Sequence, residues 1–422
     1  MTRTLPQWLL HLEHLHPRTI DLGLTRVRRV WERMSLPVSF PVITVAGTNG
    51  KGSTCAFLEC MLRCAGYRTA LYTSPHLLCY NERVRFAGEA ASDAQLCHAF
   101  EQVEAARGDV PLTFFEFGTL AALHVFIASK VEVAVLEVGL GGRLDAVNLI
   151  DPDVAVVTSI GIDHVDFLGP TREHIGYEKA GILRQGVPAV CGDREPPSTL
   201  LAHAAHIGAP LQRVGLDFDV EGHATHWDYC GAQRSRKGLP WPALRGQVQL
   251  LNAASALAAL DCLHERVPVD MGAIRRGLVE VQLPGRFQVI PGRPLVVLDV
   301  AHNPDSAREL AANLAAQTDC AQTFAVMGML RDKDIEGVVR HLFPQVSRWF
   351  LTSLGGPRGA SAERLAQAVN AVGSVSCACY ANPVEAFESA RSIAEPNDRI
   401  VTFGSFLTVA DVLAYLQRTY HG

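Results

Sequence analysis

The chain has 422 residues, of which 48% are hydrophobic and 19% are charged. This length exceeds that of one typical core and indicates two or three domains, and the composition is that of a well-packed globular protein. The net charge of −5 argues against a nucleic-acid-binding surface, and because the chain has neither a membrane-length apolar stretch nor a signal-like N-terminus, we expect a cytoplasmic protein that binds no membrane.

The first predicted strand, residues 42–46, leads into a turn that contains three glycines and Lys51. An amphipathic helix follows and is expected to stop at Gly66. Strand, glycine-rich loop and helix together form a phosphate cradle, because backbone N–H groups, the helix N-terminus and the lysine all attract an anion. Gly52 follows the lysine where the usual P-loop has Ser or Thr. We therefore predict a variant phosphate loop, with an ordinary strand-to-helix turn as the alternative.

Strands and helices alternate through the next part of the chain. Near-continuous apolar strands between helices indicate a parallel sheet that is covered on both faces. The predicted strands are 68–73, 132–138, 153–159 and 187–191, and the predicted helices are 93–107 and 115–130. Residues 214–245, rich in Gly, His and Trp, are expected to form a short β segment before a helix over 252–265.

A Pro- and Gly-rich stretch at 284–294 marks a domain boundary, after which the alternation restarts. The strands expected there are 295–300, 323–328, 348–353, 375–380 and 399–403, with helices near 304–316, 335–343, 361–371, 383–394 and 406–418. We predict an α/β fold in two domains. Residues 1–287 form a P-loop-type domain with a mostly parallel sheet, and residues 288–422 form a smaller Rossmann-like domain.

Two side chains stand at the carboxyl ends of neighbouring strands in the first domain. Glu137 ends a buried strand, and such an end points into the crevice where α/β folds bind ligands. Beside a phosphate loop its natural task is to hold Mg²⁺, and a surface acid is the alternative. His164 follows the next strand on the same edge. Imidazole is not a preferred Mg²⁺ ligand, so both a metal-site role and a structural role stay open for His164.

The positions of four further polar residues in the sequence bear on whether they belong to a functional site. Lys179 is flanked by Ala and Gly, and this composition predicts a solvated helix lysine. Arg286 stands at the domain boundary. Asp299 and His302 fall on the ligand-binding edge of the second sheet, where Asn303 is expected to cap the following helix.

The chain closely resembles the bacterial dihydrofolate synthase/folylpolyglutamate synthases, a family within the Mur-ligase superfamily. The matching motifs, in chain order, are residues 46–53, 73–76, 136–145, 163–164, 178–182, 284–287, 299–304 and 404–406. The resemblance runs from about residue 7 to the C-terminus. It implies an ATP-dependent ligase that adds L-glutamate to 7,8-dihydropteroate, giving dihydrofolate, and adds further glutamates to reduced folates such as tetrahydrofolate through an acyl-phosphate intermediate.

Three alternatives compete with this function. One is a folylpolyglutamate synthase that lacks the first activity. Another is a different Mur-type amide ligase, although the phosphate loop begins at residue 47 and leaves no room for the N-terminal domain of the cell-wall enzymes. The last is an ATP-hydrolysing switch or motor, against which the variant loop and the second α/β domain both argue. The resemblance further implies ATP, two Mg²⁺ ions and a monomer that works on small molecules.

The resemblance also implies a role for each matching position. The implied ATP-binding residues are Thr48, Asn49, Gly50, Lys51, Gly52, Ser53, Asn252, Arg286 and Asp299. The implied metal ligands are Ser74, Glu137, His164 and Lys179, the last as a carbamate, which contradicts the solvated-lysine interpretation. The implied dihydropteroate-binding residues are Arg18, Thr19, Ile20, Asp21, Thr113, Phe114, Phe115, Glu116, Leu144, Asp145 and Ala146. Lys51, Lys179 and His302 are the residues that we assign to catalysis.

Overall fold

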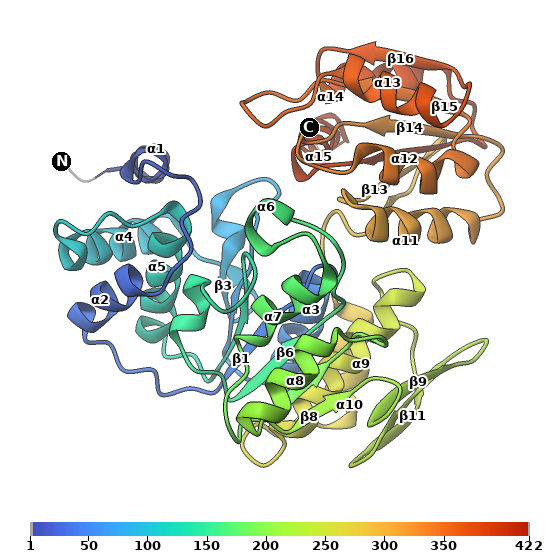
Figure 1. Ribbon diagram of the computed structural model, residues 1–422. Helices are drawn as coiled ribbons and strands as arrows, with labels where there is room; N and C mark the ends of the chain where they lie inside the picture. Colours follow the sequence, from blue (N-terminus) through green and yellow to red (C-terminus); the bar gives the residue numbers. More distant parts are fainter. Residues whose placement is uncertain (1–2, 421–422) are drawn as a thin grey trace. The chain divides into compact units, whose positions relative to one another are not determined.

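The computed structural model of the protein describes residues 3–420 and separates into two compact units (Figure 1). The first unit runs to Ala243 and resumes over Leu250–Val281. The second consists of Leu244–Gln249 and the chain from Gln282 onward. Among residues 3–420, no helix has the length and apolarity that a membrane span requires.

The first unit is built on an eight-stranded sheet. Neighbouring strands from β2 to β8 pair in parallel, and β3 and β4 add an antiparallel edge. In sheet order the strands are β4 (Glu89–Ala90), β3 (Val84–Phe86), β2 (Thr69–Tyr72), β5 (Val133–Glu137), β1 (Val42–Ala46), β6 (Val154–Val157), β7 (Ala189–Cys191) and β8 (Leu211–Arg213). The five strands that the apolar runs predict in this region are confirmed.

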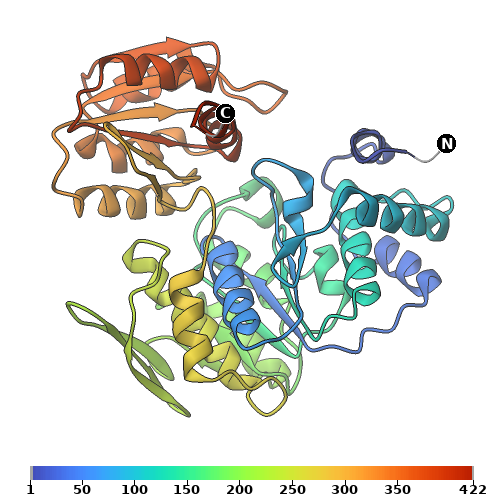
Figure 2. The same cartoon turned by 180° about the vertical axis from the view of Figure 1, so that it is seen from behind.

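Helices cover both faces of this sheet. In Figure 1, α7 and α8 lie in front of the strands, and in the reverse view of Figure 2 the blue α3 and the yellow α10 lie side by side on the other face. The helices are α1 (Leu5–Leu15), α2 (Thr25–Met34), α3 (Lys51–Cys64), α4 (Asp93–Arg107), α5 (Phe114–Ala128), α6 (Val165–Leu168), α7 (Arg172–Ala180), α8 (Ser198–Ile207), α9 (Gln247–Cys262) and α10 (Met271–Glu280). Two 3₁₀ turns lie at Tyr80–Arg83 and Ala146–Leu149.

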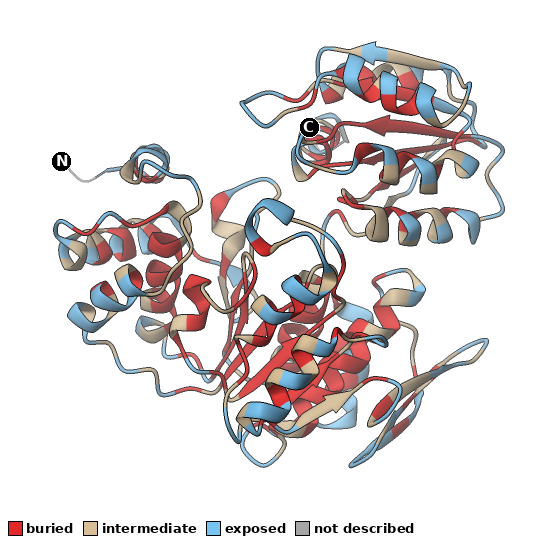
Figure 3. Cartoon of the chain, in the orientation of Figure 1, coloured by how far each residue is buried: buried red, intermediate tan, exposed pale blue. Residues whose placement is uncertain are grey.

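Burial follows from this layering. Every residue of β1, β5 and β6 is buried, which Figure 3 shows as an unbroken red centre. Strands with helices on both faces have no polar side, and this explains why they read as continuous apolar runs and not as alternating ones. The prediction of a parallel sheet covered on both faces is confirmed.

Some elements differ from the sequence-based expectation. Two helices, α1 and α2, precede the first strand, and α9 begins at Gln247, five residues before the predicted start at residue 252. The stop of α3 is confirmed, since the helix ends at Cys64, just before Gly66. Helix α2 carries Val27, Val30, Trp31 and Met34 at positions i, i+3, i+4 and i+7, which is the apolar spacing of an amphipathic helix.

The predicted β segment is a separate three-stranded antiparallel sheet in the order β11-β10-β9. Its strands are β9 (Phe218–Gly222), β10 (Trp227–Gly231) and β11 (Ser235–Leu239). A buried ion pair joins this sheet to α9: the Arg236 guanidinium donates to both Asp261 oxygens at 3.0 and 2.5 Å, and the Tyr229 hydroxyl donates to the same carboxylate at 3.3 Å. The sheet formed by β9, β10 and β11 is called the small sheet.

The second unit contains a six-stranded sheet in the order β12-β13-β17-β14-β15-β16, parallel except for β12. Its strands are β12 (Gln288–Ile290), β13 (Leu295–Leu298), β14 (Thr323–Met327), β15 (Arg348–Thr352), β16 (Cys377–Tyr380) and β17 (Arg399–Phe403). Its helices are α11 (Pro304–Ala315), α12 (Ile335–Leu342), α13 (Ala362–Val372), α14 (Pro383–Ile393) and α15 (Phe406–Tyr420), with a 3₁₀ turn at Phe343–Gln345. The predicted Rossmann-like α/β architecture is confirmed.

Candidate functional site

The strand order of the first unit gathers the predicted metal and phosphate residues at one edge. Strands β2, β5, β1 and β6 are successive neighbours and run parallel. Their carboxyl ends therefore meet at the same edge, which is where open α/β sheets bind ligands. Ser74 follows β2, Glu137 ends β5, the phosphate loop follows β1 and His164 follows β6.

The phosphate loop between β1 and α3 leaves no room for a side chain at two of its glycines. A Cβ on Gly47 would lie 1.7 Å from the Thr158 hydroxyl, and one on Gly50 would lie 2.4 Å from the Asn252 side-chain oxygen. Both glycines also have positive φ, +153° and +87°. The Thr158 hydroxyl donates to the Asn49 carbonyl at 2.7 Å and so fixes the loop from β6. Asn252 is thus placed beside the phosphate loop, where the resemblance implies an ATP contact.

Two lysines converge on one carbonyl of this loop. Lys51, the first residue of α3, donates to the Gly47 oxygen at 3.0 Å and to the Thr48 oxygen at 3.2 Å. Lys179, from α7, donates to the same Gly47 oxygen at 2.8 Å. Lys179 is only 3% exposed, so the solvated-lysine interpretation from composition is wrong. Burial, followed by the nearby Lys51 charge, lowers the pKa of Lys179 well below its ordinary value.

Burial of Lys179 follows from close packing of the turn after β5 against α7. A Cβ on Gly142 would lie 2.8 Å from the Glu178 carbonyl, so this turn can approach α7 only through glycine. The Arg143 guanidinium then pairs with the Glu178 carboxylate at 2.7 Å. The run of glycines after Glu137 therefore serves to bring β5 and α7 together around the lysine.

The predicted metal residues carry oxygen and nitrogen donors at the same edge. Glu137 is buried and accepts a hydrogen bond from the Ser74 backbone N–H at 3.2 Å. His164 has φ of +53°, uncommon for a residue with a side chain and typical of functional positions. Its imidazole lies 3.8 Å from the Asp163 carboxylate. The edge thus holds a carboxylate from β5 and an imidazole–carboxylate pair after β6.

The predicted dihydropteroate segments lie together in the first unit. The Gly23 N–H donates to the Leu144 carbonyl at 3.1 Å, which joins the N-terminal segment to the turn before Asp145. Phe115 packs against Gly139 and lies 5.9 Å from the Tyr72 ring. Asp145 accepts backbone hydrogen bonds from Leu140 and Val147, both at 2.9 Å, and burial raises its pKa to about 7.

Arg26, a residue that sequence reasoning missed, connects two of these segments. Its guanidinium lies 2.6 Å from the Asp21 carboxylate and 3.2 Å from the Glu116 carboxylate, which is buried. Glu116 is also held by a reciprocal capping interaction with Thr113 at the start of α5. The segment around residues 18–21 is therefore fixed to α5 by one arginine. Nothing in the local sequence marks Arg26, because both of its partners are distant in the chain or outside its own helix.

In the second unit, five side chains lie at the carboxyl edge of β13 and β17. Asp299 accepts from the Phe287 and Ala301 N–H groups, both at 2.8 Å, and its burial raises its pKa. The Arg286 guanidinium lies 5.3 Å above the Phe406 ring, and the His302 ring lies 6.3 Å from the same ring. Asn303 caps α11 as predicted, accepting from the Ser306 N–H at 2.9 Å.

Comparison with protein families gives two matches. Residues 45–217 match the family described as "Mur ligase middle domain", and residues 285–406 match "Mur ligase, glutamate ligase domain". The "Dihydrofolate synthase/folylpolyglutamate synthase" of Escherichia coli (strain K12) is 44% identical over 420 residues, covering 99% of this chain and 97% of that protein.

Solved structures show the same likeness. The structure described as "E.coli FolC in complex with DHPP and ADP" superposes with a TM-score of 0.94 at 44% identity, over 99% of this chain and 98% of that one. A bifunctional folylpolyglutamate synthase/dihydrofolate synthase "with Mn, AMPPNP and L-Glutamate bound" gives a TM-score of 0.91 at 46% identity, over 99% of this chain and 98% of that one.

Proposed function

The chain belongs to the dihydrofolate synthase/folylpolyglutamate synthase family of Mur ligases, and from that premise we propose how its own residues divide the work of the reaction. The protein is an ATP-dependent ligase that joins L-glutamate to 7,8-dihydropteroate, giving dihydrofolate, and adds further glutamates to reduced folates. The observation that carries the proposal is the convergence of Lys51 and Lys179 on the Gly47 carbonyl beside Glu137 and His164.

The chemical problem is that a carboxylate does not react with an amine, because its leaving group would be oxide. Phosphorylation by ATP converts the carboxylate into an acyl phosphate, and the α-amine of glutamate then displaces phosphate. The protein's share is positioning and neutralisation of charge. In the first unit, Lys51 and the N-terminus of α3 face the phosphates, and Ser53 and Asn252 border the same loop. In the second unit, Arg286 and Asp299 are proposed as ATP-binding residues because they match such positions in the family.

The donor set at the carboxyl edge fits a divalent metal ion. Glu137 provides the hard oxygen that Mg²⁺ and Mn²⁺ prefer, Ser74 a hydroxyl, and His164 a nitrogen that suits Mn²⁺ better than Mg²⁺. A bound ion of this kind neutralises phosphate charge. An ammonium group would repel it. We therefore propose that Lys179 acts as a carbamate, an anion that accommodates a second ion, and its burial favours the neutral amine from which a carbamate forms.

We assign binding of the pterin ring to residues 18–21, 113–116 and 144–146, the segments that Arg26 and the turn before Asp145 hold together. Phe114 and Phe115 offer aromatic faces to a flat heterocycle, and Asp21, Glu116 and Asp145 offer carboxylates to its N–H groups. His302, on the edge of the second sheet, is proposed to act near the reacting groups from that unit.

The deciding experiment measures ADP release by the purified protein with dihydropteroate or tetrahydrofolate, each with and without L-glutamate. We expect release only when a pteridine acid and glutamate are both present, with both acids accepted. ADP release with tetrahydrofolate plus glutamate, but not with dihydropteroate plus glutamate, would reduce the function to folylpolyglutamate synthesis. ADP release that needs neither a pteridine acid nor glutamate would contradict the ligase function and favour an ATP-driven switch.

A further inference from the structure

The end of the β9–β10 hairpin gathers three potential metal ligands on one face. Side chains alternate between the two faces of a strand, and Gly222 pairs with Trp227 across this hairpin. His223 and His226 flank that pair, and Asp228 lies two residues beyond His226. Trp227 and Tyr229 are buried on the inner face, so the alternation places both histidines and Asp228 on the outer face.

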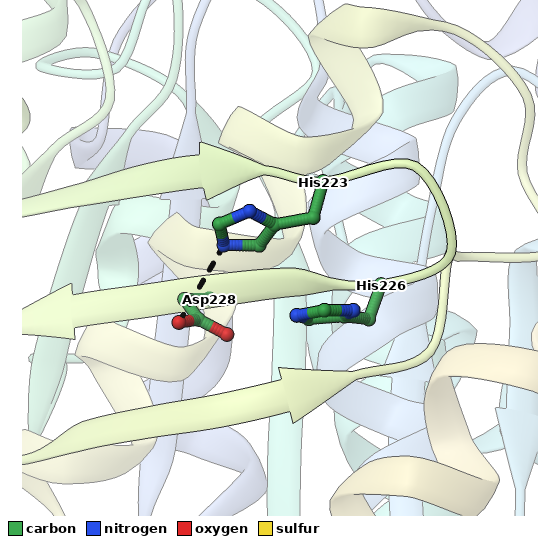
Figure 4. A group of neighbouring side chains, drawn as sticks. All are labelled: His223, His226 and Asp228. Carbon is green, nitrogen blue, oxygen red and sulfur yellow. Dashed lines mark ion pairs between the residues drawn. The ribbon is translucent and has the colours of Figure 1, made fainter.

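The three side chains converge in space, as Figure 4 shows. One ligand atom from each residue lies within 4.8 Å of the other two. The two imidazole rings are 4.5 Å apart between centroids, and the His223 Nε2 lies 3.7 Å from an Asp228 oxygen. Zinc holds nitrogen and oxygen ligands at about 2.0–2.2 Å, so its ligand atoms stand roughly 3–3.5 Å apart. Small rotations of these partly exposed side chains would bring their ligand atoms from the present separations to those that zinc requires.

The backbone holds this arrangement before any ion binds. The His223 N–H donates to the His226 carbonyl at 2.8 Å and fixes the two histidines across the turn. The Gly238 N–H of β11 donates to one Asp228 oxygen at 2.7 Å, which leaves the other oxygen directed toward His223. The register of β10 and β11 shifts between Trp227 and Tyr229, at Asp228 itself. Such bulges re-aim a side chain and are typical of functional positions.

A charge argument also favours a cation here. Glu221 is the direct cross-strand partner of Asp228, and like charges directly opposite each other destabilise an antiparallel pair. A divalent ion bound by Asp228 turns this repulsion into attraction.

We propose that His223, His226 and Asp228 form a binding site for one divalent transition-metal ion of the zinc class, outside the catalytic edge. The two imidazoles favour zinc over Mg²⁺, the carboxylate is the third ligand, and water takes the fourth position. The ion ties the two strands together beside the turn that joins β9 to β10. The Arg236–Asp261 pair anchors the opposite face of the small sheet to α9. The metal ion therefore stabilises the small sheet, and it takes no part in joining glutamate to the substrate.

The test is calorimetric titration of the full-length, chelator-treated protein with Zn²⁺, in excess Mg²⁺ and ADP so that the catalytic edge is occupied. The variant is His223→Ala combined with His226→Ala. The matched control is His203→Ala combined with His206→Ala, a pair of histidines with the same spacing on α8. The exposed Cys230, a competing thiol on β10, is retained in all three proteins.

We expect the wild type and the control to bind one more equivalent of Zn²⁺ than the hairpin variant. Loss of single second-shell partners already lowers metal affinity about 10- to 100-fold, so removal of two ligands should lower it at least about 100-fold. Zinc should also slow amide hydrogen exchange over residues 218–231 in the wild type and in the control, but not in the hairpin variant.

Glutamate-dependent ADP release measures folding independently and should be the same in all three proteins. Equal zinc stoichiometry and affinity in wild type and hairpin variant would overturn the proposal. Asp228→Asn provides a second, milder variant, since an amide keeps the acceptor for Gly238 but lowers the affinity for zinc. An unchanged zinc affinity of Asp228→Asn would likewise overturn the assigned ligand set.

Discussion

Lys179 offers the sharpest test, because its amine is buried although its local composition predicts a solvated lysine. Burial lowers its pKa well below 10.5 in the folded protein, whereas the unfolded chain keeps an ordinary lysine pKa. Between these two values the unfolded state binds one more proton than the folded state. The free energy of unfolding therefore rises with pH across that interval, by about 1.4 kcal/mol per pH unit. Lys179→Met keeps a similar volume and removes this contribution.

The assay is urea unfolding of the ligand-free wild type and Lys179→Met in bicarbonate-depleted buffer, at several pH values below 10.5. We expect the difference in free energy of unfolding between the two proteins to change by about 1.4 kcal/mol per pH unit. Lys237→Met, which removes an exposed lysine, is the matched control and should follow the wild type. A pH-independent difference between wild type and Lys179→Met at every pH up to 10.5 would refute the conclusion that burial lowers the pKa of the Lys179 amine.

The same neutral amine is the form that takes up CO₂. Each unit by which the pKa falls raises the neutral fraction about tenfold as long as the pKa stays above the working pH. Incubation with ¹³C-bicarbonate should give a carbamate resonance in the wild type that Lys179→Ala lacks. Lys179→Ala should lose at least about 100-fold in kcat/KM, about 2.7 kcal/mol of transition-state stabilisation, and added acetate or formate should restore part of it. Near-normal activity of Lys179→Ala would return the residue to a structural role.

Three further outcomes are expected. Lys51→Ala should abolish both synthase activities and leave the unfolding transition nearly unchanged, because Lys51 is the first residue of α3 and lies outside the buried core; wild-type turnover in the folded variant would contradict the phosphate role. Asp21→Ala should lower kcat/KM for dihydropteroate more than for tetrahydrofolate, because the resemblance implies that Asp21 binds dihydropteroate; equal losses in the two assays would instead show that Asp21 has a common structural role through its pair with Arg26. Arg236→Met should destabilise the protein by about 3–5 kcal/mol in urea unfolding, since it leaves the Asp261 carboxylate buried and unpaired, and adding Asp261→Leu should recover most of that loss; a double variant no more stable than the single one would show that the pair itself is indispensable.

Local sequence correctly predicted the strand, glycine turn and helix around Lys51, because the features that form them are local. A β-branched strand, a glycine turn and an amphipathic helix follow one another directly around Lys51, and each has its own spacing signal. Glu137 and His164 were placed on the same edge from one further rule, that parallel neighbours end on the same side. The cap at Asn303 follows from the same kind of short-range chemistry.

Residues whose role depends on distant partners were missed or misjudged. The local sequence predicts that Lys179 is solvated. In the structure, the glycine turn after β5 packs against α7 and excludes water from Lys179. Arg26 shows its role only when α5 brings Glu116 within 3.2 Å of it. The outer face of the β9–β10 hairpin depends on strand register, and a shift of one residue would have turned His223 and Asp228 inward.

The sequence by itself determined the parallel α/β architecture of both units and the strand, glycine turn and helix around Lys51, because periodicity and turn chemistry act over a few residues. Tertiary structure alone decided which ionisable groups are buried and which are paired, as at Lys179, Arg26 and the Arg236–Asp261 pair. Burial and pairing depend on which distant segments come into contact, and the chemistry of a charged group changes with the water around it far more than with its neighbours in the chain.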